Sequence, residues 1–438
     1  MASNPLVGIF KIKELRERVL FTLAMLVVFR LGAVIPLPGI DVVALKAYFN
    51  SQAGGGNAIV DYLDFFAGGA FSNFSVFMLG IMPYITMSIM MQLFIIIFPS
   101  LKKISEEEGG RKKIQQYQRI GTILVCLVQS YGTTLYATQI DVVTISKLSF
   151  TMIAMLTVTT GTMFLMWIGE QITKRGIGNG VSLLIFAGIV ARLPTAVIEL
   201  VERVQDRSLN PVYVVVVLAM FIAIVALVVF EQQGQRKIPV HYAKRVVGRK
   251  MYDGRSTYIP FKINPSGVIP VIFASSILMF PMQLAQSFGG NAGWIASVSR
   301  FLNPQGWAYN ILYVLLIIFF AYFYTQVTLN PIEIAKQIRE NGGSIPGIRT
   351  EKIESYLMGI LNRIILPGSL YLALIAVLPT IIQVLFKFPA SISYLMGGTS
   401  LLILVGVDLD TMSQVEALLK MHHHEGLTKK GKLRARNL

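Results

Sequence analysis

The sequence predicts an all-α integral membrane protein. Of its 438 residues, 54% are hydrophobic and 14% are charged, whereas soluble domains are about 45–50% apolar and about 25% charged. Ten apolar windows approach the ~20 residues that a helix needs to cross a bilayer. They are too long for the ~10-residue strands of a membrane barrel, so helices, which satisfy their own backbone hydrogen bonds in lipid, are expected. The windows are Val19–Ile35, Phe74–Pro99, Ile120–Gln139, Leu148–Ile168, Gly178–Ile198, Val212–Phe230, Val268–Phe288, Trp307–Thr328, Ile365–Phe386 and Ile392–Val407.

The positive charges predict how these spans are oriented. The net charge is +16, and 31 of the 39 Lys and Arg residues fall in the N-terminal segment, the C-terminal tail and every second loop. Cytoplasmic loops carry such an excess, so both termini are expected in the cytoplasm, as an even number of spans requires. No small-residue cleavage site precedes the first span, so no removable signal peptide is expected. The single cysteine, Cys126, excludes an intramolecular disulfide.

Two cytoplasmic loops are large enough to bind a partner. The loop at 231–264 combines eight positive charges with tyrosines and with apolar residues at period two, which predicts a β-structured protrusion. The loop at 331–363 carries glycine and proline turn residues that would project Arg349. Two basic loops on one face suggest docking of a large anionic partner such as RNA, although orientation alone would also explain the charges. The candidate docking residues are Arg245, Arg249, Lys250 and Arg349.

The spans contain few groups that could couple transport to an ion gradient. Proton and cation coupling needs titrating or coordinating side chains at mid-membrane. Here the charged residues fall near the ends of their spans, where an interfacial or snorkelling role is expected. They are Arg30, Glu170, Glu231, Asp408 and Asp410.

Enzyme and metal motifs are absent from the sequence. There is no Walker A, HExxH or GxSxG pattern. The stretch "GIGNG", at Gly176–Gly180, follows a helical pattern rather than a strand. We therefore interpret it as a turn that opens the fifth helix and not as a nucleotide loop. The adjacent His422, His423 and His424 lack the spacing of a metal site and are assigned to the tail.

Several long blocks of the sequence resemble one family. In order they are "GGAFSNFSVFMLGIMPYITMSIMMQL", "MWIGEQITKRGIGNGVSLLIFAGIVA", "NPSGVIPVIFASSILMFP", "GSIPGIRT" and "GGTSLLILVGV". They resemble the bacterial SecY protein-conducting channels, and the resemblance runs from the first span to the tail. It implies ten transmembrane helices in two pseudo-symmetric five-helix halves, an inverted repeat hinged at about Arg192–Asn210. The implied segments are a cytoplasmic 1–18, an N-terminal half at 19–200, a C-terminal half at 201–415 and a basic tail at 416–438.

The resemblance also gives a role to the short segment before the second long span. In this family the second helix is split, and its first half is a plug seated outside a constriction. Short length and paired glycines suit a segment that must pack and then be displaced. A re-entrant interfacial helix without a gating role is the alternative. The matching residues are Asp61, Tyr62, Leu63, Asp64, Phe65, Phe66, Ala67, Gly68, Gly69, Ala70, Phe71 and Ser72.

The resemblance places a constriction and a lateral opening on specific residues. A narrow ring of aliphatic side chains offers no hydrogen bonds to water or ions, so it dewets when empty and deforms around a passing chain. The family opens sideways between its second and seventh helices, although polar residues there could be packing contacts alone. The matching ring residues are Ile81, Ile85, Ile185, Ile272 and Ile403. The matching gate residues are Ser88, Gln92, Ser275, Ser276 and Phe280.

Together these features predict a channel and not an enzyme. Unfolded secretory polypeptides would cross the bacterial cytoplasmic membrane through it, and hydrophobic segments would leave sideways into lipid. The implied partners are SecE and SecG subunits, a SecA motor or a ribosome, signal sequences, client polypeptides and membrane lipids, and no cofactor or metal is expected. Ion-dependent solute uptake would favour a secondary transporter instead, and convergent polar groups at mid-depth would favour a membrane-embedded enzyme.

Overall fold

The described part of the chain forms two compact units. Unit 1 comprises the described residues of Met1–Glu199, Gln283–Ala296 and Ile403–Leu438, and unit 2 those of Leu200–Met282 and Ser297–Leu402. The computed structural model describes residues 12–52, 64, 67–207, 210–242, 245–247, 250–252, 256–287, 301–302, 306–386, 393 and 398–430.

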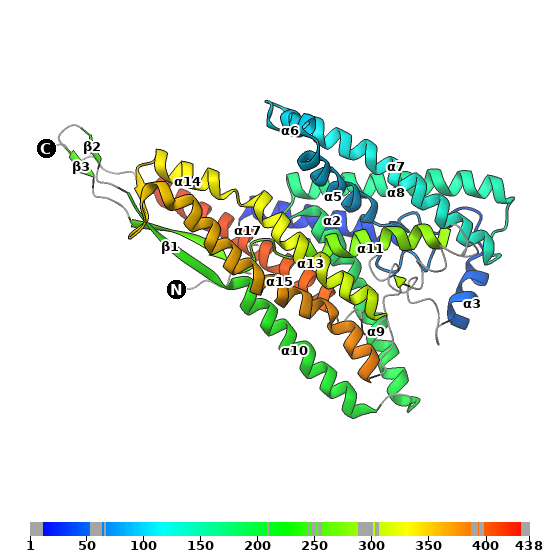
Figure 1. Ribbon diagram of the computed structural model, residues 1–438. Coiled ribbons are helices and arrows are strands. Elements are labelled where there is room, and N and C mark those ends of the chain that lie inside the picture. The colour runs from blue at the N-terminus through cyan, green and yellow to red at the C-terminus, as the bar shows by residue number, and fades with distance from the viewer. Residues whose placement is uncertain are drawn as a thin grey trace. The chain divides into compact units, whose positions relative to one another are not determined.

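Unit 1 is helical, and its long helices pack along one another. Helix α7 lies beside α8, α5 packs on α7, and α2 packs on α8 (Figure 1). Small residues allow these close approaches: a Cβ on Gly121 of α7 would lie 2.4 Å from Cε of Met87 on α5. The helices are α2 (Lys13–Val34), α3 (Val42–Gln52), α5 (Met82–Ile97), α6 (Pro99–Glu106), α7 (Gly110–Gln139) and α8 (Lys147–Arg175), with most of α9 (Gly180–Gln205) and most of α17 (Gly398–Lys430).

The second predicted span is broken at both ends. The window Phe74–Pro99 was expected to be one helix, but α5 begins only at Met82. Phe74 and Gly80 have φ angles of 41° and 57°, which are incompatible with a right-handed helix. At the other end, the chain bends by 103° between α5 and α6. Pro99 restricts the preceding Phe98 to an extended conformation, which ends α5 there.

Unit 2 combines long helices with a small sheet. Helix α15 packs against α10, α13 and α14 (Figure 1). Asn310 of α13 accepts a hydrogen bond of 3.2 Å from the hydroxyl of Thr380 on α15. The helices are α10 (Pro211–Gln233), most of α11 (Ile269–Ser287), α13 (Trp307–Thr328), α14 (Pro331–Glu340), the 3-10 turn η1 (Thr350–Lys352) and α15 (Ile353–Phe386).

The predicted β protrusion is confirmed, and the loops at 231–264 and 331–363 both contribute strands to one of its sheets. Strand β1 (Gln235–Tyr242) pairs antiparallel with β4 (Ser256–Lys262) on one side and with β5 (Gly343–Ser344) on the other. Strands β2 (Arg245–Val247) and β3 (Lys250–Tyr252) form a second pair. The apolar face of the larger sheet packs on α14 and the start of α15, through a buried cluster that includes Ile238, Val240, Phe261, Ile338, Ile345, Ile353 and Leu357.

Each of the ten predicted windows overlaps a helix. Within the described residues, six helices are long and apolar enough to cross a bilayer, and the bent α5–α6 pair could form a seventh span. Several helices extend beyond their windows into expected loops, since an apolar window measures contact with lipid and not helix length. Thus α9 runs to Gln205 through the expected hinge, α14 and the first part of α15 lie within the expected 331–363 loop, and α17 continues to Lys430 in the expected tail.

Candidate functional site

The described part of the predicted plug segment, Asp64 and residues 67–72, consists mainly of turns. Asp64 is helical, but residues 67–80 are described as turns and one bridge. Gly68 and Gly69 have φ angles of 66° and 88°, which L side chains rarely adopt. Asp64 closes the segment: its Oδ1 accepts a hydrogen bond of 2.7 Å from the backbone N–H of Ser72, and its carbonyl oxygen accepts one from Gly69. The other plug residues predicted, Asp61, Tyr62, Leu63, Phe65 and Phe66, lie outside the described residues.

Two arginines from different helices hold the plug segment. Arg192 of α9 forms an ion pair with Oδ2 of Asp64, whose side chain is 8% exposed. Arg30 of α2 donates a hydrogen bond of 2.9 Å to the carbonyl oxygen of Gly68. The backbone of Gly68 also lies against α9, because a Cβ at this position would be 2.7 Å from the Cα of Gly188. The plug segment is therefore bound by charge at two points and by close backbone packing.

The chain just after the plug segment, at residues 74–76, is also held by contacts. Phe74 is fully buried, and its carbonyl oxygen accepts a 2.8 Å hydrogen bond from the N–H of Leu37. The carbonyl of Ile35 accepts another from the N–H of Val76. The ring of Phe74 stacks on Tyr136 of α7, with the ring centroids 6.4 Å apart. These contacts attach residues 74–76 firmly to the chain that follows α2.

The five predicted ring residues are not on the outer surface of the described chain. Ile81 and Ile85 are each 6% exposed and occupy the start of α5, one helical turn apart. Ile185, in the first turns of α9, is 5% exposed, and Ile403 of α17 is 2% exposed. Ile272 of α11, in unit 2, is half-buried. An isoleucine facing lipid would be exposed, as Leu156 of α8 is at 71%.

The predicted gate residues contribute polar atoms with few partners. Ser88 and Gln92 on α5 are half-buried, and Oε1 of Gln92 is buried without a hydrogen-bond partner among the described residues. On α11, the hydroxyl of Ser275 donates to the carbonyl of Ile272 in its own helix at 2.9 Å. The buried hydroxyl of Ser276 has no hydrogen-bond partner among the residues that the structure describes. The side chain of Phe280 lies outside the described residues.

The "GIGNG" stretch is a turn that begins α9, as expected. Three of its N–H groups are already bonded to side chains, so these three are not free to hold phosphate. Ile177 donates to the hydroxyl of Thr22, Gly178 donates to Oε1 of Gln414, and Gly180 donates to the hydroxyl of Thr173. A cluster of Leu15, Ile177 and Val415 packs beside it. The turn therefore joins α2, α8 and α17 within unit 1.

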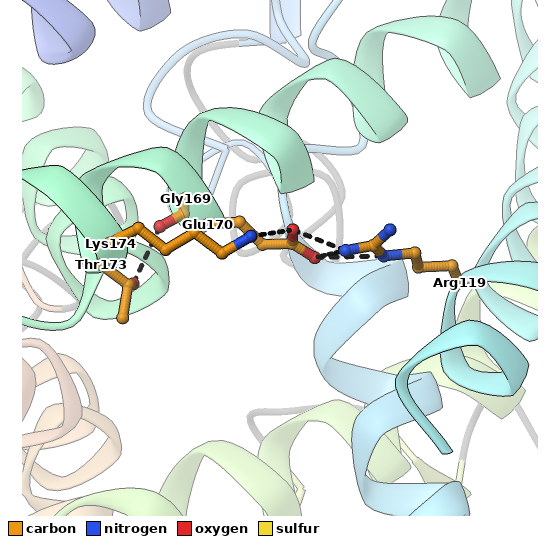
Figure 2. A network of polar contacts seen from close by, with 5 residues as sticks. All are labelled: Arg119, Gly169, Glu170, Thr173 and Lys174. Carbon is orange, nitrogen blue, oxygen red and sulfur yellow. Dashed lines mark hydrogen bonds and ion pairs between the residues drawn. The ribbon is translucent and has the colours of Figure 1, made fainter. Parts of the chain in front are cut away.

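A charged network joins α7 to α8 near the same turn. Figure 2 shows the guanidinium of Arg119 facing the carboxylate of Glu170, with contacts of 2.7 and 2.8 Å from Nη2 to the two carboxylate oxygens. Nζ of Lys174 lies 3.7 Å from the same carboxylate. Glu170 was expected to be an interfacial residue, and its position is explained by this pairing.

The described residues among those predicted to dock a partner lie in or near the two small sheets of unit 2. Arg349 is exposed and precedes η1, and its carbonyl accepts a hydrogen bond from Lys352. The backbones of Arg245 and Lys250 belong to strands β2 and β3, while Arg249 lies outside the described residues. Along β1 and β4 the basic side chains point outward: Arg236, Lys237 and Lys262 are exposed, and Nζ of Lys237 lies 4.8 Å from the ring centroid of Tyr258.

The sequence did not reveal the partners of the plug segment. Arg30 was assigned to the membrane interface, and Arg192 was counted only as a loop charge. A signal was present, because a charged residue within an apolar window is costly and is usually paired with another polar group. What the sequence lacked was the partner, since Arg30 and Gly68 are 38 positions apart.

Comparison with known proteins places these features in one family. A family model described as SecY matches residues 75–412. The protein translocase subunit SecY of Borreliella burgdorferi is 47% identical over 416 residues, covering 94% of each chain. That of Escherichia coli K12 is 42% identical over 429 residues, covering 96% of this chain and 95% of the relative. A solved structure described as a protein-conducting channel has a TM-score of 0.66 at 19% identity, and Sec61 in a canine ribosome–channel complex has 0.62 at 18%; each comparison covers 92% of both chains.

Proposed function

This chain belongs to the SecY family, and we propose how its own residues build the channel. The protein is a multi-pass component of the bacterial inner membrane, a protein-conducting channel and not an enzyme. Isoleucines 81, 85, 185, 272 and 403 form its constriction. The low exposure of four of these side chains supports this assignment. Aliphatic side chains seal against ions when the channel is idle, because they cannot replace the hydration of an ion.

The plug segment closes the idle channel on one side of this constriction. Its attachment to α2 and α9 of unit 1, and the burial of Phe71 and Phe74, support a seated conformation. A related solved structure is described as one in which the plug domain stabilises the closed state and maintains a membrane seal. In this chain the plug must leave its seat whenever a polypeptide enters.

Hydrophobic segments leave sideways between α5 and α11. The supporting observation is the pair of buried polar atoms without partners in the described residues, Oε1 of Gln92 and the hydroxyl of Ser276. An unsatisfied buried polar group costs about 1–3 kcal/mol, so a helix surface that carries one is poorly suited to permanent closure. Whether a segment of the passing polypeptide enters the lipid would then depend on its free energy of transfer into the membrane. At the centre of a helix, each Leu or Ile favours entry by about 0.3–0.6 kcal/mol, and each Arg or Asp opposes it by about 2.5–3.5 kcal/mol.

The cytoplasmic sheet is the docking surface for the partner that drives transport. Both termini lie in the cytoplasm in this proposal, on the basis of the charge bias. Sec61 and Ssh1 occur in solved ribosome complexes, and a SecA motor would use the same basic surface. Small SecE and SecG subunits would accompany the chain. The exposed basic residues of β1 and β4 support this surface, because their sheet has a buried apolar base, and the loop that carries the exposed Arg349 adds strand β5 to the same sheet.

A polar substitution in the ring tests the constriction. Replacing Ile403 with Asn should hydrate the ring, raise the ion current of the idle channel and allow export of precursors with defective signal sequences. The measurements are the current across planar bilayers that contain the reconstituted translocase and the export of such precursors in cells. Leu156→Asn, at an exposed position of α8, is the matched control. An unchanged current and unchanged export in Ile403→Asn would count against the assignment.

A further inference from the structure

The charged residues around the plug segment are placed so that they hold the segment against its neighbouring helices. Asp64 lies in the plug segment, whereas Arg192 and Arg30 lie on two different helices, α9 and α2. Arg30 and Arg192 belong to apolar windows, where a cation is costly unless a polar group compensates it. Here each cation contacts the plug segment. These contacts with the seated plug segment therefore offset part of the cost of placing the two arginines in the membrane.

The carboxylate of Asp64 takes part both in the turn inside the plug segment and in the contact between this segment and α9. One carboxylate oxygen accepts the N–H of Ser72, and the other pairs with Arg192. The same carboxylate therefore closes the turn and binds α9. Its side chain is 8% exposed, so water screens the pair weakly. Pulling the segment away from α9 would leave a carboxylate and a guanidinium without each other in a poorly hydrated site.

We propose that Asp64, Arg192 and the Arg30–Gly68 hydrogen bond form a plug latch that sets how readily the channel opens. This inference rests on the proposed plug role and assigns the positioning residues for it. A signal sequence or entering chain opens the channel by supplying interactions that exceed those of the plug latch. Weakening the plug latch then raises the population of the open state without a ligand, as for any two-state equilibrium.

Charge variants test the plug latch in the reconstituted translocase. We expect Asp64→Asn and Arg192→Gln each to raise the idle potassium chloride current by about tenfold or more, since hydrogen bonds to charged groups are among the stronger ones. The double variant Asp64→Arg with Arg192→Asp restores the ion pair in reverse but not the hydrogen bond from Ser72, so its current should fall well below that of either single variant. Arg207→Gln, an exposed cation just beyond α9, should leave it unchanged.

A purely structural role for the pair predicts a different result. In that case the reversed pair would not rescue closure, and the single variants would lower the amount of folded protein without raising the current per channel. Either result, or single variants as tight as the wild type, would overturn the plug latch. Current is therefore normalised to the amount of translocase that is recovered in the membrane.

A glycine pair tests the seating without changing any charge. A Cβ on Gly68 would lie 2.7 Å from the Cα of Gly188, while a Cβ on Gly80 would meet nothing closer than 3.8 Å. Both residues have a positive φ, 66° and 57°, so the backbone strain of an alanine is similar. Gly68→Ala should raise the idle current several-fold and Gly80→Ala should not. Equal currents in the two variants would contradict the close seating on α9.

Deleting residues 62–69 separates the plug latch from the plug itself. If the deletion raises the idle current but the charge variants do not, the plug role stands and the plug latch is wrong. If the deleted channel also remains tight, the proposed plug role fails and the plug latch fails with it. A raised current in both the deletion and the charge variants, with rescue by the reversed pair, supports both.

Discussion

At the scale of single residues, the charges in unit 1 are explained by their partners. Arg30 and Glu170 were expected to lie at interfaces because they fall near the ends of their spans. In the structure each one joins segments that are distant in sequence, Arg30 to Gly68 and Glu170 to Arg119. The cost of a charge near lipid is visible in the sequence, but the partner that offsets it depends on tertiary packing.

The Arg119–Glu170 pair should contribute measurably to stability. Glu170→Gln removes the charge and one side of a bidentate contact. We therefore expect the free energy of unfolding to fall by about 1–2 kcal/mol, a figure already discounted for the partial exposure of Arg119. The measurement is the thermal unfolding of the purified protein in detergent. Glu17→Gln is the control, because Glu17 and its partner Lys13 are largely exposed and 3.9 Å apart. Equal midpoints for the two variants would show that the network in Figure 2 contributes little.

At the scale of elements, the sequence predicted the cytoplasmic protrusion because period-two apolar residues define a half-buried strand. It could not predict that the second loop adds strand β5 to the same sheet. That strand has only two residues, Gly343 and Ser344, which is too short for any periodic signal. The apolar cluster under the sheet explains why the two loops meet. Ile338 of α14, Ile345 just after β5 and Ile353 of α15 all belong to this buried cluster, and they lie on both sides of β5 in the sequence.

Arg349 should act in partner-driven export and not in folding. Its side chain is exposed, and its backbone carbonyl accepts a hydrogen bond from Lys352 that the substitution keeps, so Arg349→Glu should leave the free energy of unfolding within about 0.5 kcal/mol of that of the wild type. Export that depends on the motor should fall sharply, because the charge reversal opposes an anionic partner. Motor-stimulated transport into proteoliposomes provides the measurement. Lys147→Glu, an exposed residue in a loop expected on the opposite face, is the control, and normal transport by Arg349→Glu would contradict the docking surface.

The element before α5 shows a second limit of sequence analysis. The window Phe74–Pro99 is uniformly apolar, so hydropathy alone predicts one span. Positive φ angles at Phe74 and Gly80 delay the helix to Met82. Glycine can signal such a turn, but a phenylalanine with positive φ cannot be anticipated, because bulky residues rarely adopt it. The surrounding contacts of Phe74 with Leu37 and Tyr136 hold it there.

At the scale of the whole molecule, composition and charge bias were enough to predict a multi-span helical protein. Long blocks of sequence were enough to indicate its family, and 42–47% identity to SecY relatives over nearly the whole chain confirms it. The ring was assigned through the resemblance alone, since an isoleucine in an apolar span carries no distinguishing chemistry. Burial separates Ile81, Ile85, Ile185 and Ile403 from residues that face lipid, but only a passing polypeptide can report the path itself.

Cross-linking of a stalled secretory chain tests that path most directly. Photoreactive residues would be placed at Ile81, Ile185 and Ile272, with Leu156 and Phe230, which are 71% and 78% exposed, as controls for contact with lipid. A precursor halted midway should cross-link to all three isoleucine positions and to neither control. Labelling of the controls with none at the three isoleucines would show that the polypeptide takes another route and that this account of the channel is wrong.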